Sequence, residues 1–374
     1  MRIYLLLMAL AAAVTFLATP LARFLALRTN AITAVRERDV HTVPMPRLGG
    51  VAMLIGFAVT LTVASQMPFL RPLFDGSTGN LPLPWAILVS ATVVCLLGVA
   101  DDIWDLDWLT KLVGQVLAAG FMAWQGVQLI QFPVFGLTIG SSRLSLIVTI
   151  LVVVTAINAV NFVDGLDGLA AGVIAIGGTA FFGYTYVLTT TQSPGDYSNI
   201  ATAVMACVVG VCLGFLPHNF FPARIFMGDS GAMFLGLTMS AASILVTGQI
   251  DPARIDVGTA LPAFVVIILL PLAVLMLPLL DMGLAVARRL LAGKSPFHPD
   301  RMHLHHRLLD FGHSHRRAVL IMYIWTAVLA FSAAAFAIPD VPVPVLAAGI
   351  GIGLALAIWA TLRLPRQPFP RLNR

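Results

Sequence analysis

The residues that could do chemistry in this chain gather in short polar segments between long apolar runs. The first segment holds Asp101 and Asp102, two adjacent carboxylates at the end of an apolar run, with Lys111 a little further on. Carboxylates this close repel each other, which favours a bound cation or a shared proton. A solvated helix end is the plainer interpretation, but acidic residues at a helix C-terminus oppose the helix dipole. The pattern therefore favours a functional carboxylate pair.

A second segment carries two amides and two carboxylates. Asn158, Asn161 and Asp164 are spaced three residues apart, so they can share one face of a helix. Asn158 lies inside an apolar run, where an amide needs a hydrogen-bond partner. Asp164 and Asp167 are each followed by glycine, which breaks a helix and lets a ligand approach the backbone. A turn with an Asp cap would explain the carboxylates but not both amides.

A third segment runs from Asn219 through Phe226 to Asp229 and Ser230, just before another apolar run. Asp229 is typical of a helix N-cap. It also suits a phosphate–Mg²⁺ site, because a helix N-terminus attracts anions and carboxylate oxygens bind Mg²⁺. Beside the first two segments, we favour the phosphate–Mg²⁺ site.

Six of the eight histidines fall between positions 298 and 315, and Arg301, His303, His305 and His306 form the centre of this tract. A zinc site is one alternative, but no cysteine or glutamate is near and the spacing is not a usual zinc pattern. A solvated polar loop is another alternative. We favour an anion-binding loop, because Arg and His donate hydrogen bonds to phosphate and sugar oxygens.

These segments need apolar helices to position them. Hydrophobic residues make up 59% and charged residues 10% of the 374 residues, which excludes a soluble globular protein and a disordered one. Continuous apolar runs also exclude an outer-membrane barrel. We predict an all-α integral membrane protein with a single polytopic domain over residues 1–374. About eleven runs are long enough to span a bilayer, near 3–27, 48–70, 83–100, 109–128, 145–163, 168–191, 200–216, 230–247, 259–287, 318–338 and 341–362.

Eleven spans place the chain ends on opposite sides of the membrane. Eighteen of the 22 Lys and Arg residues fall on the side of the C-terminus, which the positive-inside rule makes cytoplasmic. The N-terminus is then outside, and cytoplasmic loops lie near 28–47, 101–108, 164–167, 217–229 and 288–317. All four polar segments fall on this cytoplasmic side. The span middles are nearly free of charge, which argues against a nucleotide-sugar or lipid transporter.

Carboxylates for Mg²⁺, amides for a base or sugar, and Arg and His for phosphates together predict phosphoryl transfer from a nucleotide-activated substrate. The chain carries no Walker P-loop and no dinucleotide fingerprint, and we expect no nucleic-acid partner. A zinc-dependent membrane hydrolase that uses the histidine tract is the rival from another class.

Four motifs resemble those of the polyprenyl-phosphate N-acetylhexosamine-1-phosphate transferase family: ADD at 100–102, NxxNFVDGLDG at 158–168, FMGDSG at 226–231 and DRxHxHHRLLD at 300–310. The HLHH tract is closer to the WecA/TagO-like branch than to the related MraY branch. The resemblance implies transfer of GlcNAc-1-phosphate from UDP-GlcNAc to undecaprenyl or decaprenyl phosphate. UMP would be released at the cytoplasmic face of the bacterial plasma membrane, at the start of cell-envelope glycan synthesis. Transfer of phospho-MurNAc-pentapeptide is the alternative.

The resemblance also implies a Mg²⁺ (or Mn²⁺) cofactor, a homodimer and roles for single residues. Asp229, with Asp102, would ligate the metal on the UDP diphosphate. Asp101 or Asp102 would serve the polyprenyl phosphate, and Asp164 and Asp167 would be catalytic and help to place the metal. The nucleotide would contact Asn158, Asn161, Asp164, Asp167, Asn219 and Phe226. The sugar and phosphates would contact Arg301, His303, His305, His306, Lys111 and Arg47.

Overall fold

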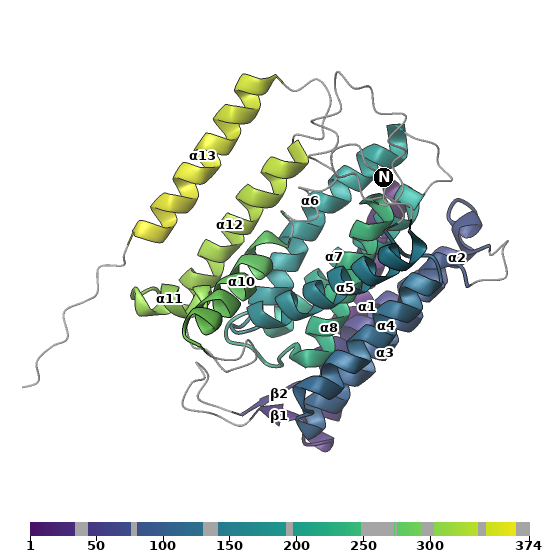
Figure 1. The fold of residues 1–374 in the computed structure, drawn as a ribbon, viewed down its shortest axis with the longest axis horizontal. Helices are drawn as coiled ribbons and strands as arrows, with labels where there is room; N and C mark the ends of the chain where they lie inside the picture. Colours follow the sequence, from purple (N-terminus) through teal and green to yellow (C-terminus); the bar gives the residue numbers. More distant parts are fainter. Residues whose placement is uncertain are drawn as a thin grey trace, which may run out of the picture.

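The computed structural model describes residues 1–33, 44–75, 81–129, 141–191, 197–247, 273, 275–293, 303–335 and 342–363. These residues form helices and one short hairpin (Figure 1). The elements are α1 (Arg2–Arg28), β1 (Ile32–Thr33), β2 (Met45–Pro46), α2 (Gly49–Gln66), the 3-10 helix η1 (Arg71–Phe74), α3 (Leu83–Trp104), α4 (Trp108–Trp124), α5 (Ser142–Val163), α6 (Leu169–Thr191), α7 (Tyr197–Asn219), α8 (Gly228–Thr247), α10 (Met276–Leu291), α11 (Leu304–Asp310), α12 (His315–Ala335) and α13 (Val343–Leu362).

The helices α1 to α8 run alternately up and down. The ends of α1, α3, α5 and α7 therefore meet the starts of α2, α4, α6 and α8 at one end of the bundle. The backbone contacts at this end include Gly49 N–H to Phe226 O and Gly50 N–H to Met227 O. At the opposite end, the N-terminal amine of Met1 contacts the hydroxyl of Tyr186, near the end of α6. The polar segments that the sequence singles out in this part of the chain thus share one end.

Helix α8 is the centre of the bundle, and its start marks the centre of that polar end. In the most apolar 18 residues of each helix, 94% of α8 is buried, compared with 28% of α1 and 6% of α13. Helices α2, α3, α5 and α7 all pack against α8. Small residues allow this packing: a Cβ on Gly236 would lie 2.4 Å from the Cα of Ile157 in α5. A polar group at the start of α8 is therefore surrounded by helix ends.

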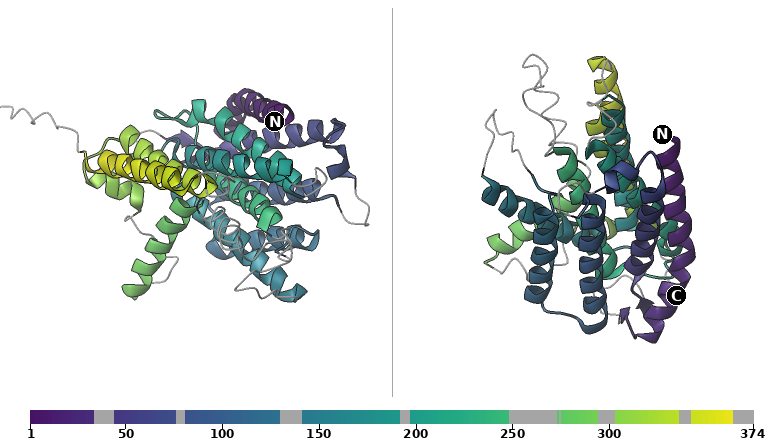
Figure 2. Two further views of the ribbon diagram at one scale, coloured as in Figure 1. Left: turned by 90° about the horizontal axis from the view of Figure 1, so that it is seen from above. Right: turned by 90° about the vertical axis from the view of Figure 1, so that its right-hand side faces the viewer.

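The last helices form a separate flank of the molecule. Helix α12 packs against α6, and α13 contacts α12 (Figure 1). Helix α10 packs against α5 at one end and extends away from the other helices when the molecule is seen from above (Figure 2). The short helix α11 lies between α10 and α12 along the chain, and its leucines join the apolar cluster around Leu277 and Met322.

Within the described residues, nine helices are long and apolar enough to cross a membrane: α1, α2, α3, α5, α6, α7, α8, α12 and α13. Each coincides with a predicted span, so an all-α membrane protein is confirmed. The predicted span near 109–128 forms α4, which has only 17 residues. The predicted span near 259–287 lies largely outside the described residues, and the total of eleven spans stays a prediction.

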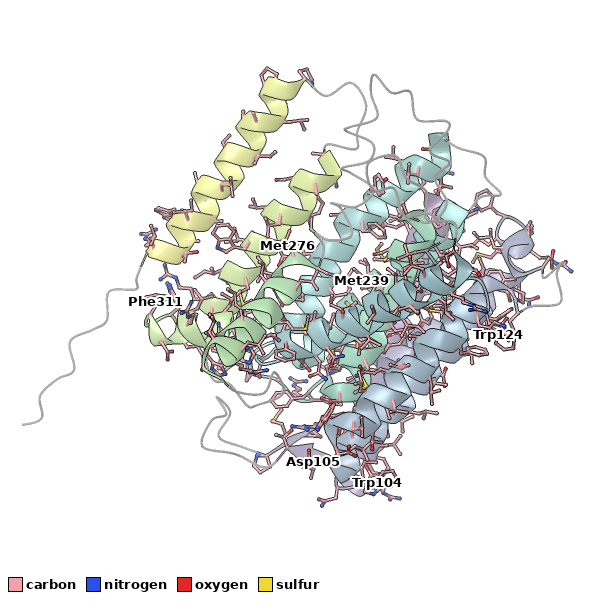
Figure 3. The ribbon with its side chains drawn as sticks, in the orientation of Figure 1. Trp104, Asp105, Trp124, Met239, Met276 and Phe311 are labelled. Carbon is pink, nitrogen blue, oxygen red and sulfur yellow. The ribbon has the colours of Figure 1, made fainter. Side chains whose placement is uncertain are left out.

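Several helices extend further into the polar segments than predicted. Helix α3 continues to Trp104, so Asp101 and Asp102 lie in its last turn and not in a loop. Helix α8 already begins at Gly228, so Asp229 lies in its first turn. Figure 3 shows Trp104 and Asp105 at the tip of the α3–α4 pair, where Asp105 ends α3 with a left-handed backbone at φ 52°. The carboxylate pair is thus held by helical backbone.

Candidate active site

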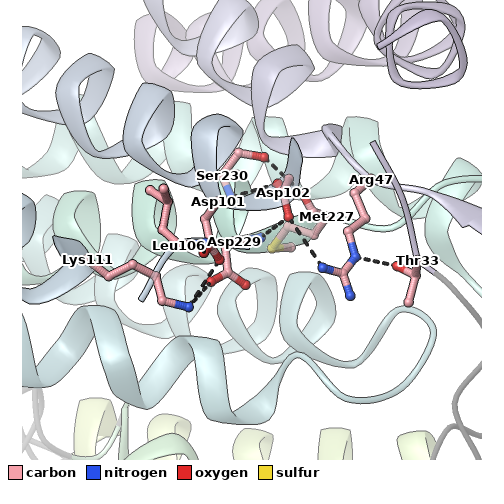
Figure 4. A network of polar contacts seen from close by, with 9 residues as sticks. All are labelled: Thr33, Arg47, Asp101, Asp102, Leu106, Lys111, Met227, Asp229 and Ser230. Atoms are coloured by element: carbon pink, nitrogen blue, oxygen red, sulfur yellow. Dashed lines mark hydrogen bonds and ion pairs between the residues drawn. The ribbon is translucent and has the colours of Figure 1, made fainter. Parts of the chain in front are cut away.

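Asp102 joins the end of α3 to the start of α8 (Figure 4). Its Oδ1 accepts the backbone N–H of Asp229 at 3.0 Å, and its Oδ2 accepts the N–H of Ser230 at 3.2 Å. The side chain is fully buried. The turn before α8 needs Gly228, because its φ is +72° and a Cβ there would lie 2.4 Å from Asp102 Oδ2. Asp102 therefore caps α8 from another helix and satisfies N–H groups that a helix start leaves unpaired.

Asp101, Asp229 and Lys111 form a compact charged cluster beside this cap. The carboxyl groups of Asp101 and Asp229 lie within reach of each other, and two carboxylates this close favour a bound cation or a countercharge. Lys111 Nζ lies 3.1 Å from Asp101 Oδ2 and 3.4 Å from Asp229 Oδ2. Asp101 Oδ1 also accepts the N–H of Leu106. A pair of carboxylates with one ammonium group is a site that a divalent cation and a phosphate can enter.

The β1–β2 hairpin brings Arg47 to the same cluster. The Arg47 guanidinium lies 3.9 Å from Asp102 Oδ1 and donates a hydrogen bond to Thr33 Oγ1. Phe226 anchors the hairpin through its backbone, since its N–H donates to Pro46 O and its carbonyl accepts the N–H of Gly49. Arg47 is thus held as a countercharge to a buried carboxylate. For Phe226, the contacts described are structural, and its predicted role at the nucleotide stays a prediction.

The two amides of α5 have different partners. The side chain of Asn161 lies within reach of the Asp229 carboxyl group, so it belongs to the charged cluster. Asn158, one turn earlier, donates to Gln115 Oε1 of α4 at 2.7 Å and to Val154 O at 2.8 Å. Gln115, which the sequence analysis did not single out, is 3% exposed. The polar partner that Asn158 needs is therefore supplied across the α4–α5 contact, and its nucleotide role stays a prediction.

The turn between α5 and α6 faces the cluster with Asp164. Burial, followed by the carboxylates of Asp229 and Asp102, raises the pKa of Asp164 to about 7. Asp164 is therefore about half protonated in neutral solution unless a cation compensates its charge. A cluster of four carboxylates with Lys111 and Arg47 is chemically suited to a bound cation.

Asp167 and Asn219 hold the shape of this turn. Asp167 Oδ2 accepts the N–H of Ala223, and the N–H of Asp167 donates to His315 Nε2 at 3.1 Å. Asn219 accepts the N–H of Gly168 and donates to Ile225 O. Both side chains thereby tie the α5–α6 turn to the segment between α7 and α8. His315, on α12, is a contact of this turn that we did not assign a role from the sequence.

The histidine tract docks on the same turn from the other side. A Cβ on Gly165 would lie 2.4 Å from His305 Nε2, so the imidazole packs directly on the Asp164–Gly165 backbone. The His303 and His305 rings are nearly parallel, with centroids 5.6 Å apart and an interplanar angle of 5°. The ring centroid of His306 lies 4.4 Å from that of His305. Burial, followed by the charge of His306, lowers the pKa of His305 to about 3, so His305 is neutral.

The structure thus brings most of the predicted residues together at one end of the bundle. Asp101, Asp102, Lys111, Asn161, Asp164 and Asp229 meet around the start of α8, with Arg47 beside them. The histidines contact this group through the α5–α6 turn. Arg301 lies outside the described residues. Among those residues, no group of three His, Cys, Asp or Glu side chains is arranged to hold a metal ion by itself, so a cation at this cluster would need substrate phosphates and water as further ligands.

Comparison with known proteins agrees with these motifs. Residues 84–247 match the model of glycosyl transferase family 4. The chain is 43% identical over 334 residues to the decaprenyl-phosphate N-acetylglucosaminephosphotransferase of Mycobacterium tuberculosis, covering 87% of this chain and 80% of the relative. The chain belongs to the polyprenyl-phosphate N-acetylhexosamine-1-phosphate transferase family. The resemblance inferred from the four motifs is confirmed.

Two other members of this transferase family place the chain within it. A probable undecaprenyl-phosphate N-acetylglucosaminyl 1-phosphate transferase of Bacillus subtilis is 31% identical over 317 residues, with 84% of this chain and 80% of the relative covered. A phospho-N-acetylmuramoyl-pentapeptide-transferase of Desulforudis audaxviator is 29% identical over 325 residues, with 80% and 86% covered. This transferase is thus more similar to these N-acetylglucosamine enzymes of Mycobacterium and Bacillus than to the pentapeptide enzyme of Desulforudis.

Proposed function

We propose that the protein transfers GlcNAc-1-phosphate from UDP-GlcNAc to a polyprenyl phosphate and releases UMP, as the first step of a cell-envelope glycan. The observation that carries this proposal is the cluster of Asp101, Asp229 and Lys111 at the end of a membrane-type helix bundle. A donor diphosphate needs a cation and an ammonium group, and a lipid phosphate needs a site at the membrane surface. The relatives named as N-acetylglucosamine enzymes support the choice of sugar.

The residues of this cluster fit a Mg²⁺ ion. Mg²⁺ is usually held by one or two carboxylates together with substrate phosphates and water, and not by an all-protein cage. The pair of Asp101 and Asp229 offers two such carboxylates. We place Asp101 rather than Asp102 beside Asp229, because both oxygens of Asp102 already accept N–H groups of α8. When bound, Mg²⁺ (or Mn²⁺) would neutralise charge on the diphosphate and polarise the phosphorus under attack.

The transfer is an in-line displacement at the β-phosphorus of UDP-GlcNAc. An oxygen of the polyprenyl phosphate forms the new bond to this phosphorus, the bond to the UMP oxygen breaks, and UMP leaves as the product. A phosphate monoester has a second pKa near ~6, so the acceptor is largely a dianion at neutral pH and needs no strong base. Lys111, held between two carboxylates, is positioned to orient a phosphate oxygen. Asp164, whose pKa is raised to about 7 by burial, can hold or release a proton as the charge changes.

We further propose that the polar end of the bundle faces the cytoplasm of a bacterial plasma membrane, with the N-terminus outside. The bias of basic residues supports this orientation. The short helix α4 fits a membrane span, because Trp108 and Trp124 are exposed at its two ends, where interfacial tryptophans are usual. Its 17 residues cover about 25 Å at 1.5 Å per residue. A homodimer remains part of the proposal, and light scattering of the purified protein in detergent would test it.

The deciding experiment is UMP release by the purified full-length protein. With Mg²⁺, polyprenyl phosphate and UDP-GlcNAc, we expect UMP that depends on all three. Asp229→Asn should abolish it, while Asp107→Asn should not. Asp107→Asn removes the same charge at the exposed N-cap of α4, where Asn caps a helix equally well. UMP released only with UDP-MurNAc-pentapeptide as donor would overturn the assignment of the sugar.

A further inference from the structure

Asp281 is a buried carboxylate on α10, outside the cluster at the start of α8. Its exposed fraction is 0%, and it lies beside the buried Leu277 and Ala285 of the same helix. A buried carboxylate must have hydrogen-bond partners, because desolvation of an unpaired charge is costly. Asp281 finds both partners in one place: its Oδ2 lies 3.1 Å from His303 Nδ1, and its Oδ1 accepts the N–H of Leu304 at 2.8 Å.

The contact with Asp281 fixes which nitrogen of His303 carries a proton. An ionised carboxylate only accepts hydrogen bonds, so Nδ1 of His303 must be the donor. Nε2 is then the ring nitrogen that can contact a substrate oxygen. Proteins use the same pairing of carboxylate and imidazole to set the tautomer and the direction of functional histidines.

Three elements restrain the His303 ring. Asp281 holds it from α10, the ring centroid of Phe162 in α5 lies 5.5 Å from that of His303, and the ring of His305 in α11 is nearly parallel to it. The guanidinium carbon of Arg289, also on α10, lies over the ring of Phe162, 5.5 Å from its centroid. By contrast, Nδ1 of His305 is buried without a hydrogen-bond partner among the described residues. In the described contacts of these two histidines, only His303 has a carboxylate that orients it.

We propose that Asp281 is a positioning residue of the transfer reaction, which holds His303 with Nε2 directed at the diphosphate of the donor. Asp281 itself touches no substrate and acts through His303. This proposal rests on the proposed function, and it adds a residue that neither the motifs nor the charged cluster contains.

The test is a double-mutant cycle on the purified full-length protein, with KM and kcat measured by UMP release. Asp281→Asn keeps one acceptor oxygen and removes the charge that orients His303. We expect a KM for UDP-GlcNAc raised about tenfold, typical of a lost hydrogen bond to a charged group. The KM for polyprenyl phosphate and kcat should stay within about twofold, because donor binding is the step affected. In a His303→Ala background, Asp281→Asn should have almost no further effect on the KM for UDP-GlcNAc.

A control separates this role from the capping of α11. Leu304→Pro removes the N–H that Asp281 accepts and leaves the contact with His303. Proline suits the first position of a helix, and His303 already has the extended backbone that precedes proline, with φ −66° and ψ 154°. We expect the KM for UDP-GlcNAc to change less than about threefold in this variant.

Each outcome decides for or against the role of Asp281. An Asp281→Asn effect that persists in the His303→Ala background, or an equal effect of Leu304→Pro, would make Asp281 a structural cap and overturn the proposal. A wild-type protein that releases no UMP would contradict the proposed function instead. The dissociation constant of UDP, which carries the same diphosphate as UDP-GlcNAc, would then be measured for each variant of the cycle. A failure to bind UDP would overturn both.

Discussion

Asp102 and Asp229 are neighbouring carboxylates for which the structure predicts opposite phenotypes. Asp102 accepts two N–H groups at the start of α8, whereas Asp229 lies beside Asp101 and contacts Lys111. The Asp102→Asn variant should therefore be less stable than the wild type, whereas the Asp229→Asn variant should lose activity but not stability. The two substitutions make the same chemical change, so the comparison isolates position.

The expected size follows from the contacts. In Asp102→Asn one of the two N–H groups keeps an acceptor, and the other loses a charged one, which costs about 1.5–3 kcal/mol. Loss of a negative charge at the N-terminus of α8 adds about 0.3–1 kcal/mol. The free energy of unfolding should fall by about 2–4 kcal/mol, and Tm by about 3–5 °C. In Asp229→Asn, Lys111 keeps Asp101 as a partner and two carboxylates no longer repel, so Tm should stay or rise.

Thermal unfolding of the full-length protein in detergent without Mg²⁺, followed by tryptophan fluorescence, measures these differences. UMP release at a temperature where both variants are folded measures activity. Asp107→Asn serves as the control in both assays. An Asp102→Asn variant with wild-type Tm and no activity would refute the reasoning, because Asp102 would then act on the metal or the substrate and not on α8.

Three further results are expected. The pKa of Asp164 is raised to about 7, so its protonated form stabilises the metal-free protein fully below about pH 4, the ordinary pKa of an aspartate, and this stabilisation is lost as the pH rises through 7. Mg²⁺ binding should tighten from pH 6 to 8, with release of a proton. Asp164→Asn should flatten the pH profiles of both stability and Mg²⁺ binding in calorimetry. Gly98→Ala should lower Tm, since a Cβ would lie 2.3 Å from a backbone nitrogen of α8, while Gly183→Ala, with nothing within 4 Å, should not. Lys111→Gln should raise the KM for a phosphate-bearing substrate at least tenfold, whereas Lys111→Arg should keep part of the affinity; an unchanged KM in Lys111→Gln would exclude a phosphate contact.

Much of this arrangement can be predicted from the sequence, because the motifs are local. The spacing of Asn161 and Asp164 predicts one helical face, and both residues do face the cluster around Asp229. The glycine after Asp164 predicts a close approach, and His305 is the group that makes it. For the nine long apolar helices of the described residues, the apolar runs predict the helix bounds to within a few residues.

The partners of these residues could not be predicted, because they come from distant parts of the chain. The sequence predicts that Asn158 contacts a ligand, yet its amide donates a hydrogen bond to Gln115 on the neighbouring helix α4. Asp281 is a single acid in an apolar run, and its partner His303 lies 22 residues further on, beyond a segment without periodicity. Adjacent Asp101 and Asp102 look equivalent in the sequence. Only the position of α8 separates them, with one carboxylate on its N–H groups and the other toward Lys111.

The antiparallel pair of α3 and α8 explains why a carboxylate pair can stand at the C-terminus of a helix at all. The dipole of α3 disfavours negative charge at its end, but the N-terminus of α8 meets the same point and favours it. Two N–H groups of α8 bind Asp102, and Lys111 offsets the charge that remains on Asp101 and Asp229. One turn earlier in α3, at Gly98, there is room only for a hydrogen, because the backbone of Ser230 is in contact. These charges therefore lie at the end of the bundle, and from this position we infer that the phosphate of a lipid acceptor reacts at the depth of the headgroups and not within the hydrocarbon core.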